Sequence, residues 1–218
     1  MPSSSPTAQS SEVPPLEQLF PFSLDDFQLE AIEALNQGHS VVVSAPTGSG
    51  KTLIGEYAIH RALAHGQKVF YTTPLKALSN QKLRDFREQF GAERVGLMTG
   101  DLTVNREASI VVMTTEIFRN MLYAEAEAGD DPLADVEAVV LDECHYMNDS
   151  QRGTVWEESI IHCPPVVQLV ALSERPSPLQ WLGIALITAA LWLVAGRDVE
   201  GPRSRDWGLG IALALGAL

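Results

Sequence analysis

The chain has 218 residues and a formal net charge of −13. This length suits one domain with a real hydrophobic core and perhaps room for a short appendage, and the acidic charge argues against a surface that coats nucleic acid broadly, although a local basic groove stays possible. The two cysteines, Cys144 and Cys163, imply no disulfide framework. They favour a reducing compartment, so we expect a cytoplasmic protein. We expect no signal peptide, because the first apolar run comes late.

Residues 1–17 are rich in Ser and Pro and offer little to bury, which predicts a disordered tail. A helical pattern then runs through Leu35. Phe22 lies just ahead of this helix and could stack on an adenine, while the amide of Gln28 could hydrogen-bond the edge of the base. The alternative is an ordinary capped helix with packed phenylalanines.

The stretch 45–52 reads Ala-Pro-Thr-Gly-Ser-Gly-Lys-Thr, between a short apolar run and a helical pattern at 53–63. A strand, a glycine-rich turn, Lys, Thr and a helix form the phosphate-binding arrangement of P-loop nucleotide hydrolases. Gly48 and Gly50 can take positive φ and turn backbone N–H groups toward a triphosphate. The new helix adds its unpaired amides and the positive end of its dipole.

Within this loop, Lys51 could reach the β- and γ-phosphates of ATP, and the Thr52 hydroxyl could bind Mg²⁺. Ala45 stands where the usual loop has Gly, so the loop is a variant. The expected nucleotide contacts of the loop are Pro46, Thr47, Gly48, Ser49, Gly50, Lys51 and Thr52.

After the loop, apolar strand patterns alternate with helical ones. The strands are expected at 68–72, 95–98, 109–114, 136–141 and 167–172, and the helices at 76–90 and 116–123. The acidic segment 124–135 is expected to be a solvated loop. This alternation predicts an α/β fold, a P-loop domain with a mainly parallel sheet covered by helices on both faces.

The strand at 136–141 is followed by Asp142-Glu143-Cys144-His145. Asp142 could hold Mg²⁺ through its water shell, and Glu143 could orient or deprotonate the attacking water. His145 is placed to sense the state of the nucleotide. Cys144 is most simply a small buried residue, because no second ligand has the spacing of a metal site.

Together these motifs resemble the first RecA-like domain of superfamily 2 DExH-box helicases, and most closely the superkiller-type RNA helicases. The resemblance covers roughly residues 18–173. The matching stretches are 22–28, the loop 45–52, Thr-Pro-Leu-Lys-Ala-Leu-Ser-Asn-Gln-Lys at 73–82, Thr-Gly-Asp at 99–101, Thr-Thr-Glu-Ile-Phe-Arg-Asn at 114–120, Asp-Glu-Cys-His at 142–145 and the segments 146–149, 152–153 and 156–158.

The resemblance implies an ATP-dependent RNA helicase domain that binds ATP, Mg²⁺ and an RNA strand. It places Gln28, Lys51 and Asp142 with their neighbours on the nucleotide side. A DNA helicase domain of the same superfamily is the alternative. The residues in motifs that face the nucleic acid are Pro74, Lys76, Asn80, Gln81, Thr99, Gly100, Thr115 and Arg119.

The basic side chains of the domain are concentrated in one region, which could follow the phosphates of a strand. This region contains Lys76, Lys82, Arg84, Arg87 and Arg94. For Arg84 and Arg87, a solvated helix face is an equally good interpretation.

The resemblance ends at Ser173, where the family continues with Ala-Thr and this chain continues with Glu174-Arg175. Residues 179–196 form an apolar run close to the minimum for a bilayer span, and a second run covers 207–218. We therefore expect a tail at 174–218 that could bind a membrane. The start of this tail is similar to a short part of drug/metabolite-transporter family proteins.

This change of pattern suggests a fusion, or a frame or assembly error, and the sequence does not say which. A second RecA-like domain, needed for full activity, is not recognisable after residue 173. We therefore expect the chain to bind ATP but not to unwind duplexes. A non-catalytic product that only binds ATP is a further alternative.

Overall fold

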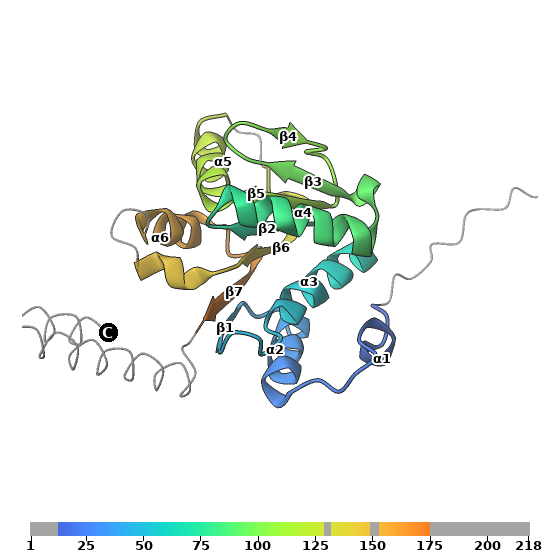
Figure 1. Cartoon of the computed structure of the whole chain (residues 1–218). Coiled ribbons are helices and arrows are strands. Elements are labelled where there is room, and N and C mark those ends of the chain that lie inside the picture. Colours follow the sequence, from blue (N-terminus) through green and yellow to red (C-terminus); the bar gives the residue numbers. More distant parts are fainter. Residues whose placement is uncertain (1–12, 129–131, 149–152, 175–218) are drawn as a thin grey trace, which may run out of the picture. The chain divides into compact units, whose positions relative to one another are not determined.

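The computed structural model describes residues 13–128, 132–148 and 153–174 (Figure 1). These residues all belong to Met1–Arg175, the first of two units into which the chain divides. The apolar runs expected at 179–196 and 207–218 lie outside the described residues. Within the described ranges, no helix combines the length and the apolar character needed to cross a membrane.

The described residues form a sheet with the strand order β1-β7-β6-β2-β5-β3-β4. Neighbouring strands are parallel throughout, except that β4 pairs antiparallel with β3 at the edge. The mainly parallel sheet predicted from the sequence is therefore confirmed. The strands are β1 (Val41–Ala45), β2 (Lys68–Thr73), β3 (Val95–Met98), β4 (Thr103–Val104), β5 (Ile110–Thr114), β6 (Val136–Leu141) and β7 (Gln168–Glu174).

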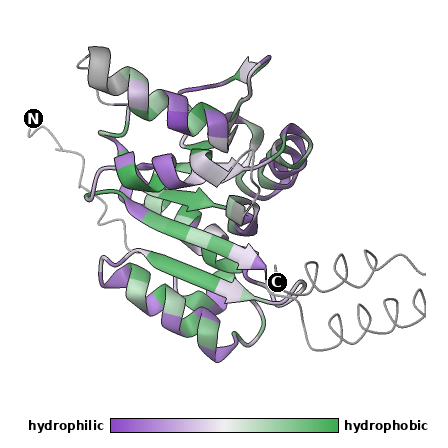
Figure 2. Cartoon of the chain, turned by 90° about the vertical axis from the view of Figure 1, so that its left-hand side faces the viewer, coloured by the Kyte–Doolittle hydropathy of each residue, from purple (hydrophilic) through white to green (hydrophobic). Residues whose placement is uncertain are grey.

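Helices cover both faces of this sheet, because successive strand residues point to opposite faces and are apolar on both (Figure 2). On one face α2, α3 and α4 pack against residues such as Val140 and Leu172. On the other face Phe118 of α5 and Trp156 of α6 pack against Val139 and its neighbours. The helices are α1 (Leu16–Leu19), α2 (Asp26–Asn36), α3 (Thr52–His65), α4 (Lys76–Phe90), α5 (Thr115–Ala128) and α6 (Gly153–His162).

Two segments that were expected to be irregular contain a helix, and β4 and α6 were not expected from the sequence. Helix α5 continues to Ala128, so the first residues of the expected loop 124–135 are helical instead. The reason is local, because this stretch alternates Ala and Glu, which are strong helix formers. At the other end, residues 13–17 do not all belong to a tail, since α1 begins at Leu16 and Val13 packs against the core.

A buried guanidinium joins the far end of α3 to its neighbours. Arg61 is only 5% exposed. It donates hydrogen bonds to the Glu137 carboxylate at the start of β6, to the Leu35 carbonyl of α2 and to the Gln168 side chain of β7. A buried charge is tolerated when it is paired and hydrogen-bonded. This cluster therefore fixes the helix that begins at the phosphate loop.

We expect Glu137→Ala to lower the free energy of unfolding by about 3–5 kcal/mol, because it leaves the Arg61 charge buried without its partner. Urea unfolding of the two proteins measures the difference. The matched control is Glu107→Ala, which breaks the exposed pair with Lys68 at 3.2 Å. That change is expected to cost less than about 1 kcal/mol. Equal costs for the two substitutions would contradict the structural role given to Arg61.

Candidate nucleotide site

The loop 46–51 connects the end of β1 to the start of α3. Gly48 and Gly50 both have a φ of 78°, a left-handed conformation that favours glycine. A Cβ atom on Gly50 would also lie 2.7 Å from Nε2 of Gln28. The Ser49 hydroxyl is buried, with no hydrogen-bond partner among the described residues. These features fit a loop that wraps a phosphate with backbone amides and one hydroxyl.

Gln28 ties α2 to this loop. Its Oε1 accepts a hydrogen bond from the Asp25 N–H at 2.9 Å, and its Nε2 donates to the Gly50 carbonyl at 3.1 Å. Nε2 also lies 3.5 Å from the Ser49 carbonyl, so both of its hydrogens have acceptors in the chain, whereas Oε1 keeps one lone pair for a base. Phe22 is 59% exposed, and its ring centroid lies 6.2 Å from that of buried Phe20. The structure therefore combines the capped helix with an aromatic face open to solvent.

Asp142 and Glu143 come directly after β6. In the sheet, β7 lies between β6 and β1, the strand that leads into the phosphate loop. Asp142 is 5% exposed, and its Oδ1 accepts the Glu143 N–H at 3.0 Å. Glu143 has a φ of 60°, a strained backbone conformation of the kind that collects at functional sites. Its Oε2 lies 3.1 Å from Nδ1 of His145, which is in the 3₁₀ helix Cys144–Asn148. The three predicted residues are thus brought together.

Lys51 is buried, and its ammonium is paired with a residue that sequence reasoning did not place in the site. Its Nζ lies 3.1 Å from Oε1 of Glu174, the last residue of β7. The other oxygen of Glu174 accepts the Thr47 hydroxyl at 3.0 Å. Glu174 pairs with Ala45 in the register of β1 and β7, so the strand itself carries this carboxylate to the loop.

The acidic groups of the site affect one another. Burial raises the pKa of Glu143, and the negative charges of Asp142 and Glu174 raise it further. Burial also acts to raise the pKa of Glu174, but hydrogen bonds from Lys51 and Thr47 outweigh it and leave this pKa below its usual value. Glu143 therefore has the higher proton affinity that suits a base accepting a proton from water.

Mg²⁺ prefers oxygen ligands and keeps several waters, so one or two protein oxygens beside a phosphate are enough to hold it. Thr52 and Asp142 supply such oxygens at the start of α3 and the end of β6. Cys144 is not suited to bind a metal, because burial raises the pKa of its thiol to about 12. Within the described ranges, no group of three His, Cys, Asp or Glu side chains could hold a metal ion by itself. The residues present therefore fit a magnesium ion that the nucleotide brings with it.

The residues expected to face nucleic acid lie at the same edge of the sheet as the nucleotide residues, the edge formed by the carboxyl ends of the parallel strands. They occupy the other half of that edge. They follow the carboxyl ends of β2, β3 and β5, whereas the nucleotide residues follow β1, β6 and β7. Lys76, Asn80, Gln81 and Gly100 are exposed, whereas Pro74, Thr99 and Thr115 are buried. Arg119 is partly exposed and its Nη1 lies 3.5 Å from a Glu158 oxygen.

The buried threonines of this group have structural partners. The Thr115 hydroxyl donates to the Thr73 carbonyl at 3.3 Å, and the Thr99 hydroxyl donates to Asp101 at 3.0 Å. The two threonine hydroxyls therefore stabilise the loops. A ligand would be contacted by the backbone and by the exposed neighbouring residues instead. Lys76 joins two of these loops, because its Nζ lies 2.9 Å from Oδ1 of Asp101.

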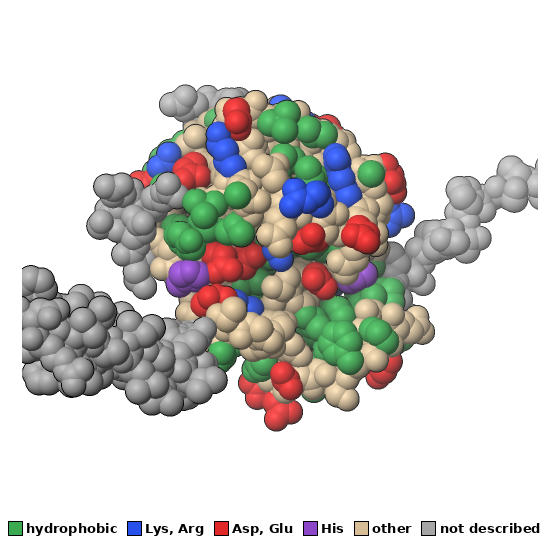
Figure 3. All heavy atoms as spheres, in the orientation of Figure 1, with side chains coloured by type: hydrophobic (Ala, Val, Ile, Leu, Met, Phe, Trp, Pro, Cys, Tyr) green, Lys and Arg blue, Asp and Glu red, His purple; other side chains and the backbone are tan. Residues whose placement is uncertain are grey.

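Lys82 does not belong to the exposed basic group expected from the sequence. Its Nζ lies 3.9 Å from Oδ2 of Asp142 and over the rings of Tyr71 and Phe86, 5.3 and 5.7 Å from their centroids. Its side chain therefore lies toward the residues of the nucleotide site. Figure 3 shows Lys and Arg side chains over the region of α4, interspersed with acidic ones.

Sequence reasoning missed Tyr71 and Glu174 in this region, and it placed Lys82 in the basic region expected to follow a nucleic-acid strand. A tyrosine inside an apolar strand signals a buried hydroxyl that needs a partner, and that signal was available. A carboxylate at the end of a strand beside β1 also signals proximity to the phosphate loop. The direction of Lys82 depends on the rotation of α4, which the sequence does not give.

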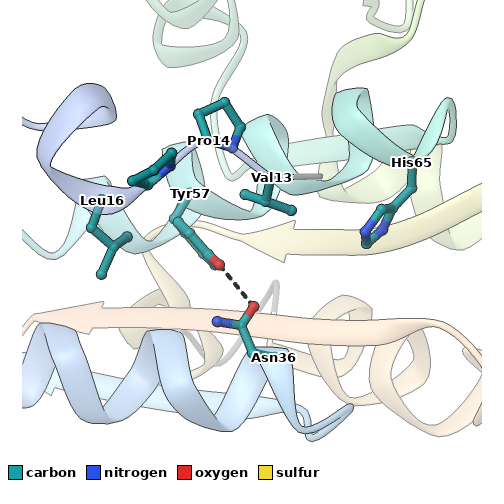
Figure 4. Close-up of a pocket in the computed structure, with 7 residues that line it drawn as sticks. Val13, Pro14, Leu16, Asn36, Tyr57 and His65 are labelled. Atoms are coloured by element: carbon teal, nitrogen blue, oxygen red, sulfur yellow. Dashed lines mark hydrogen bonds between the residues drawn. The ribbon is translucent and has the colours of Figure 1, made fainter. Parts of the chain in front are cut away.

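A separate cavity of about 550 Å³ lies along the later turns of α3, toward the end opposite the phosphate loop (Figure 4). Figure 4 shows Tyr57 donating to Asn36 beside it, over a distance of 2.7 Å. Its lining residues are Val13, Pro14, Pro15, Leu16, Asn36, Tyr57 and His65. None of them belongs to the nucleotide set, so this cavity is distinct from the candidate site.

A parallel α/β sheet with a glycine-rich phosphate loop after β1 and an Asp-Glu pair after β6 defines a P-loop nucleoside-triphosphatase domain. The model of the DEAD/DEAH box helicase family matches residues 25–174. The chain therefore belongs to the DEAD/DEAH box helicase family.

Several proteins of this family are similar to the chain. It is 55% identical over 179 residues to the chloroplastic DExH-box ATP-dependent RNA helicase DExH15 of Arabidopsis thaliana, covering 79% of this chain and 15% of that protein. It is 55% identical over 163 residues to the probable helicase HelY of Mycobacterium tuberculosis, covering 75% of this chain and 18% of that protein. It is 53% identical over 154 residues to the exosome RNA helicase MTR4 of Mus musculus, covering 71% of this chain and 14% of that protein. The chain thus spans less than a fifth of the length of each of these relatives.

Among solved structures, the helicase domain of Hef from Pyrococcus furiosus is similar to the chain with a TM-score of 0.53 and 25% sequence identity. The match covers 78% of this chain and 37% of that one. It supports the RecA-like α/β fold expected from the sequence.

Glu174 binds the Lys51 ammonium and the Thr47 hydroxyl, two groups that a triphosphate in the loop would also need. We expect Glu174→Gln to increase the affinity for ATP about two- to fivefold, because a partly exposed ion pair contributes up to about 1 kcal/mol and the variant also removes a negative charge from the loop. Calorimetric titration measures the change. Glu107→Gln is the control, since it removes an equal charge from a lysine pair at the opposite edge of the sheet. Weaker binding by Glu174→Gln would contradict this reading of the contact.

Proposed function

We propose that this chain binds ATP and Mg²⁺ and hydrolyses ATP as part of an RNA helicase. The observation that carries the proposal is the meeting of the phosphate loop after β1 with Asp142 and Glu143 after β6 at one edge of the sheet. A family match over residues 25–174 supports the helicase class. Two of the relatives compared above are named RNA helicases, which supports RNA as the partner.

In this proposal the triphosphate binds at the turn 46–52, where Lys51 and the N-terminus of α3 oppose its charge. Thr52 and Asp142 hold the magnesium ion, which supplies charge neutralisation at the transferred phosphoryl group. Glu143 accepts a proton from the attacking water. His145 follows Glu143 closely enough to respond to its charge. Phe22 and Gln28 hold the base.

The roles of Lys51 and Glu143 can be separated by experiment. Lys51→Ala is expected to weaken ATP binding about 10–100-fold, because a charged donor to the phosphates is lost. Glu143→Gln is expected to bind ATP within about twofold of the wild type and to lose hydrolysis about 10²–10⁴-fold. Calorimetry gives the affinities, and phosphate release gives the rates. Equal loss of affinity in both variants would contradict the division of roles.

RNA binding is proposed for the other half of the edge. Lys76, Asn80, Gln81 and Gly100 present charged, amide and backbone groups at the surface, and Arg119 lies on the neighbouring α5. The group follows three strand ends and lacks an exposed aromatic platform within the described residues, which suits contact with the phosphates rather than with base edges. Sequence-independent binding is therefore expected.

We expect Lys76→Ala to weaken binding of single-stranded RNA alike for different sequences. Its plot of log affinity against log salt should have a slope about 0.7 smaller in magnitude, because one phosphate contact is lost. Lys68→Ala is the matched control, since Lys68 is also paired with an acid but lies at the amino end of β2. An unchanged slope in Lys76→Ala would remove this residue from the interface. Equal stimulation of hydrolysis by RNA and DNA would contradict the choice of RNA.

A further inference from the structure

Tyr71 carries a hydroxyl into the apolar core beside the nucleotide site. It lies in β2, which is covered by neighbours on both sides, and its side chain is completely buried. Its ring packs edge-on against Phe86 of α4, with centroids 4.9 Å apart. A buried phenol needs a hydrogen-bond partner, and this one donates to Oδ2 of Asp142 at 2.7 Å. Its acceptor is a charged carboxylate, which makes this a charge-assisted hydrogen bond.

The carboxylate of Asp142 is thereby held from both sides. Oδ1 accepts the Glu143 N–H, and Oδ2 accepts the Tyr71 hydroxyl. The Lys82 ammonium lies 3.9 Å from Oδ2, with its side chain only 20% exposed. Since each carboxylate oxygen has two lone pairs, the hydrogen bonds leave room for a further contact on each oxygen. The orientation of Asp142 is therefore fixed by β2 and α4, two elements outside the nucleotide motifs.

We propose that Tyr71 and Lys82 are positioning residues that hold Asp142 in the orientation needed to bind the magnesium ion of Mg·ATP. The inference rests on the proposed function of this site. Tyr71 supplies direction through a hydrogen bond, and Lys82 supplies a charge that balances the buried carboxylate. Neither residue is expected to touch the nucleotide. Their loss should therefore change only the part of the affinity that depends on the metal.

The test compares ATP binding by the full chain with Mg²⁺ and with EDTA, using calorimetry. Tyr71→Phe removes one oxygen and keeps the ring. We expect it to lose about tenfold in affinity with Mg²⁺, the size of one hydrogen bond to a charged group, and to match the wild type in EDTA. Lys82→Met keeps the stem over the two rings and removes the charge. We expect it to change the same metal-dependent affinity several-fold and to match the wild type in EDTA, because the ammonium both contacts Oδ2 and repels a cation bound there.

Tyr57→Phe is the matched control. Tyr57 is also a buried tyrosine, 3% exposed, and its hydroxyl donates to Asn36 at 2.7 Å, next to the separate cavity. It should bind ATP like the wild type in both conditions. Thermal unfolding checks that all variants are folded. If Tyr71→Phe does not fold, the metal dependence of Lys82→Met tests the inference instead.

Unchanged metal dependence in the variants would overturn the inference, and so would an equal loss of affinity with and without Mg²⁺, which indicates a general structural role. These outcomes leave ATP binding by the wild type intact. Failure of the wild type to bind ATP in either condition would instead overturn the proposed function, and the inference with it.

Discussion

The candidate site depends on the parallel pairing of β1 with β7 and of β7 with β6. This register places the carboxyl ends of three strands at one edge, so that the loop after Ala45, Glu174 and the Asp142-Glu143 pair meet there. None of these groups is close to the others in the sequence. An antiparallel arrangement would send alternate strand ends to opposite edges, and the phosphate loop would then lie far from the carboxylates.

Charge pairing at this edge is the second constraint. Lys51 and Asp142 are both almost fully buried, and each has a partner of opposite charge, Glu174 at 3.1 Å and Lys82 at 3.9 Å. Burying either charge without a partner would be costly. The site is therefore already balanced by residues of the chain itself. A bound triphosphate must compete with Glu174 for Lys51, whereas a magnesium ion at Asp142 meets a carboxylate whose direction is set by Tyr71.

Much of this arrangement could be predicted from the sequence because it depends on local patterns. The glycine turn, the strand before it and the helix after it are encoded within about a dozen residues around Gly48, and alternation of apolar segments predicted a parallel sheet. The contacts of Gln28 and Lys82 could not be predicted in the same way. They depend on how far α2 and α4 are rotated about their axes, which is fixed by packing against the sheet. The helical continuation of α5 to Ala128 follows from the helix propensity of Ala and Glu, whereas the acidic character of the segment favours a solvated loop.

The account places a nucleotide along the turn between β1 and α3 and beside the residues that follow β6. Hydrogen–deuterium exchange with and without a non-hydrolysable ATP analogue and Mg²⁺ tests this placement directly, because bound phosphates protect the amides that they accept from. The account predicts new protection at residues 47–53 and 142–145 and none around the cavity lined by Val13 and Tyr57. Protection at the cavity with none in the loop would contradict it.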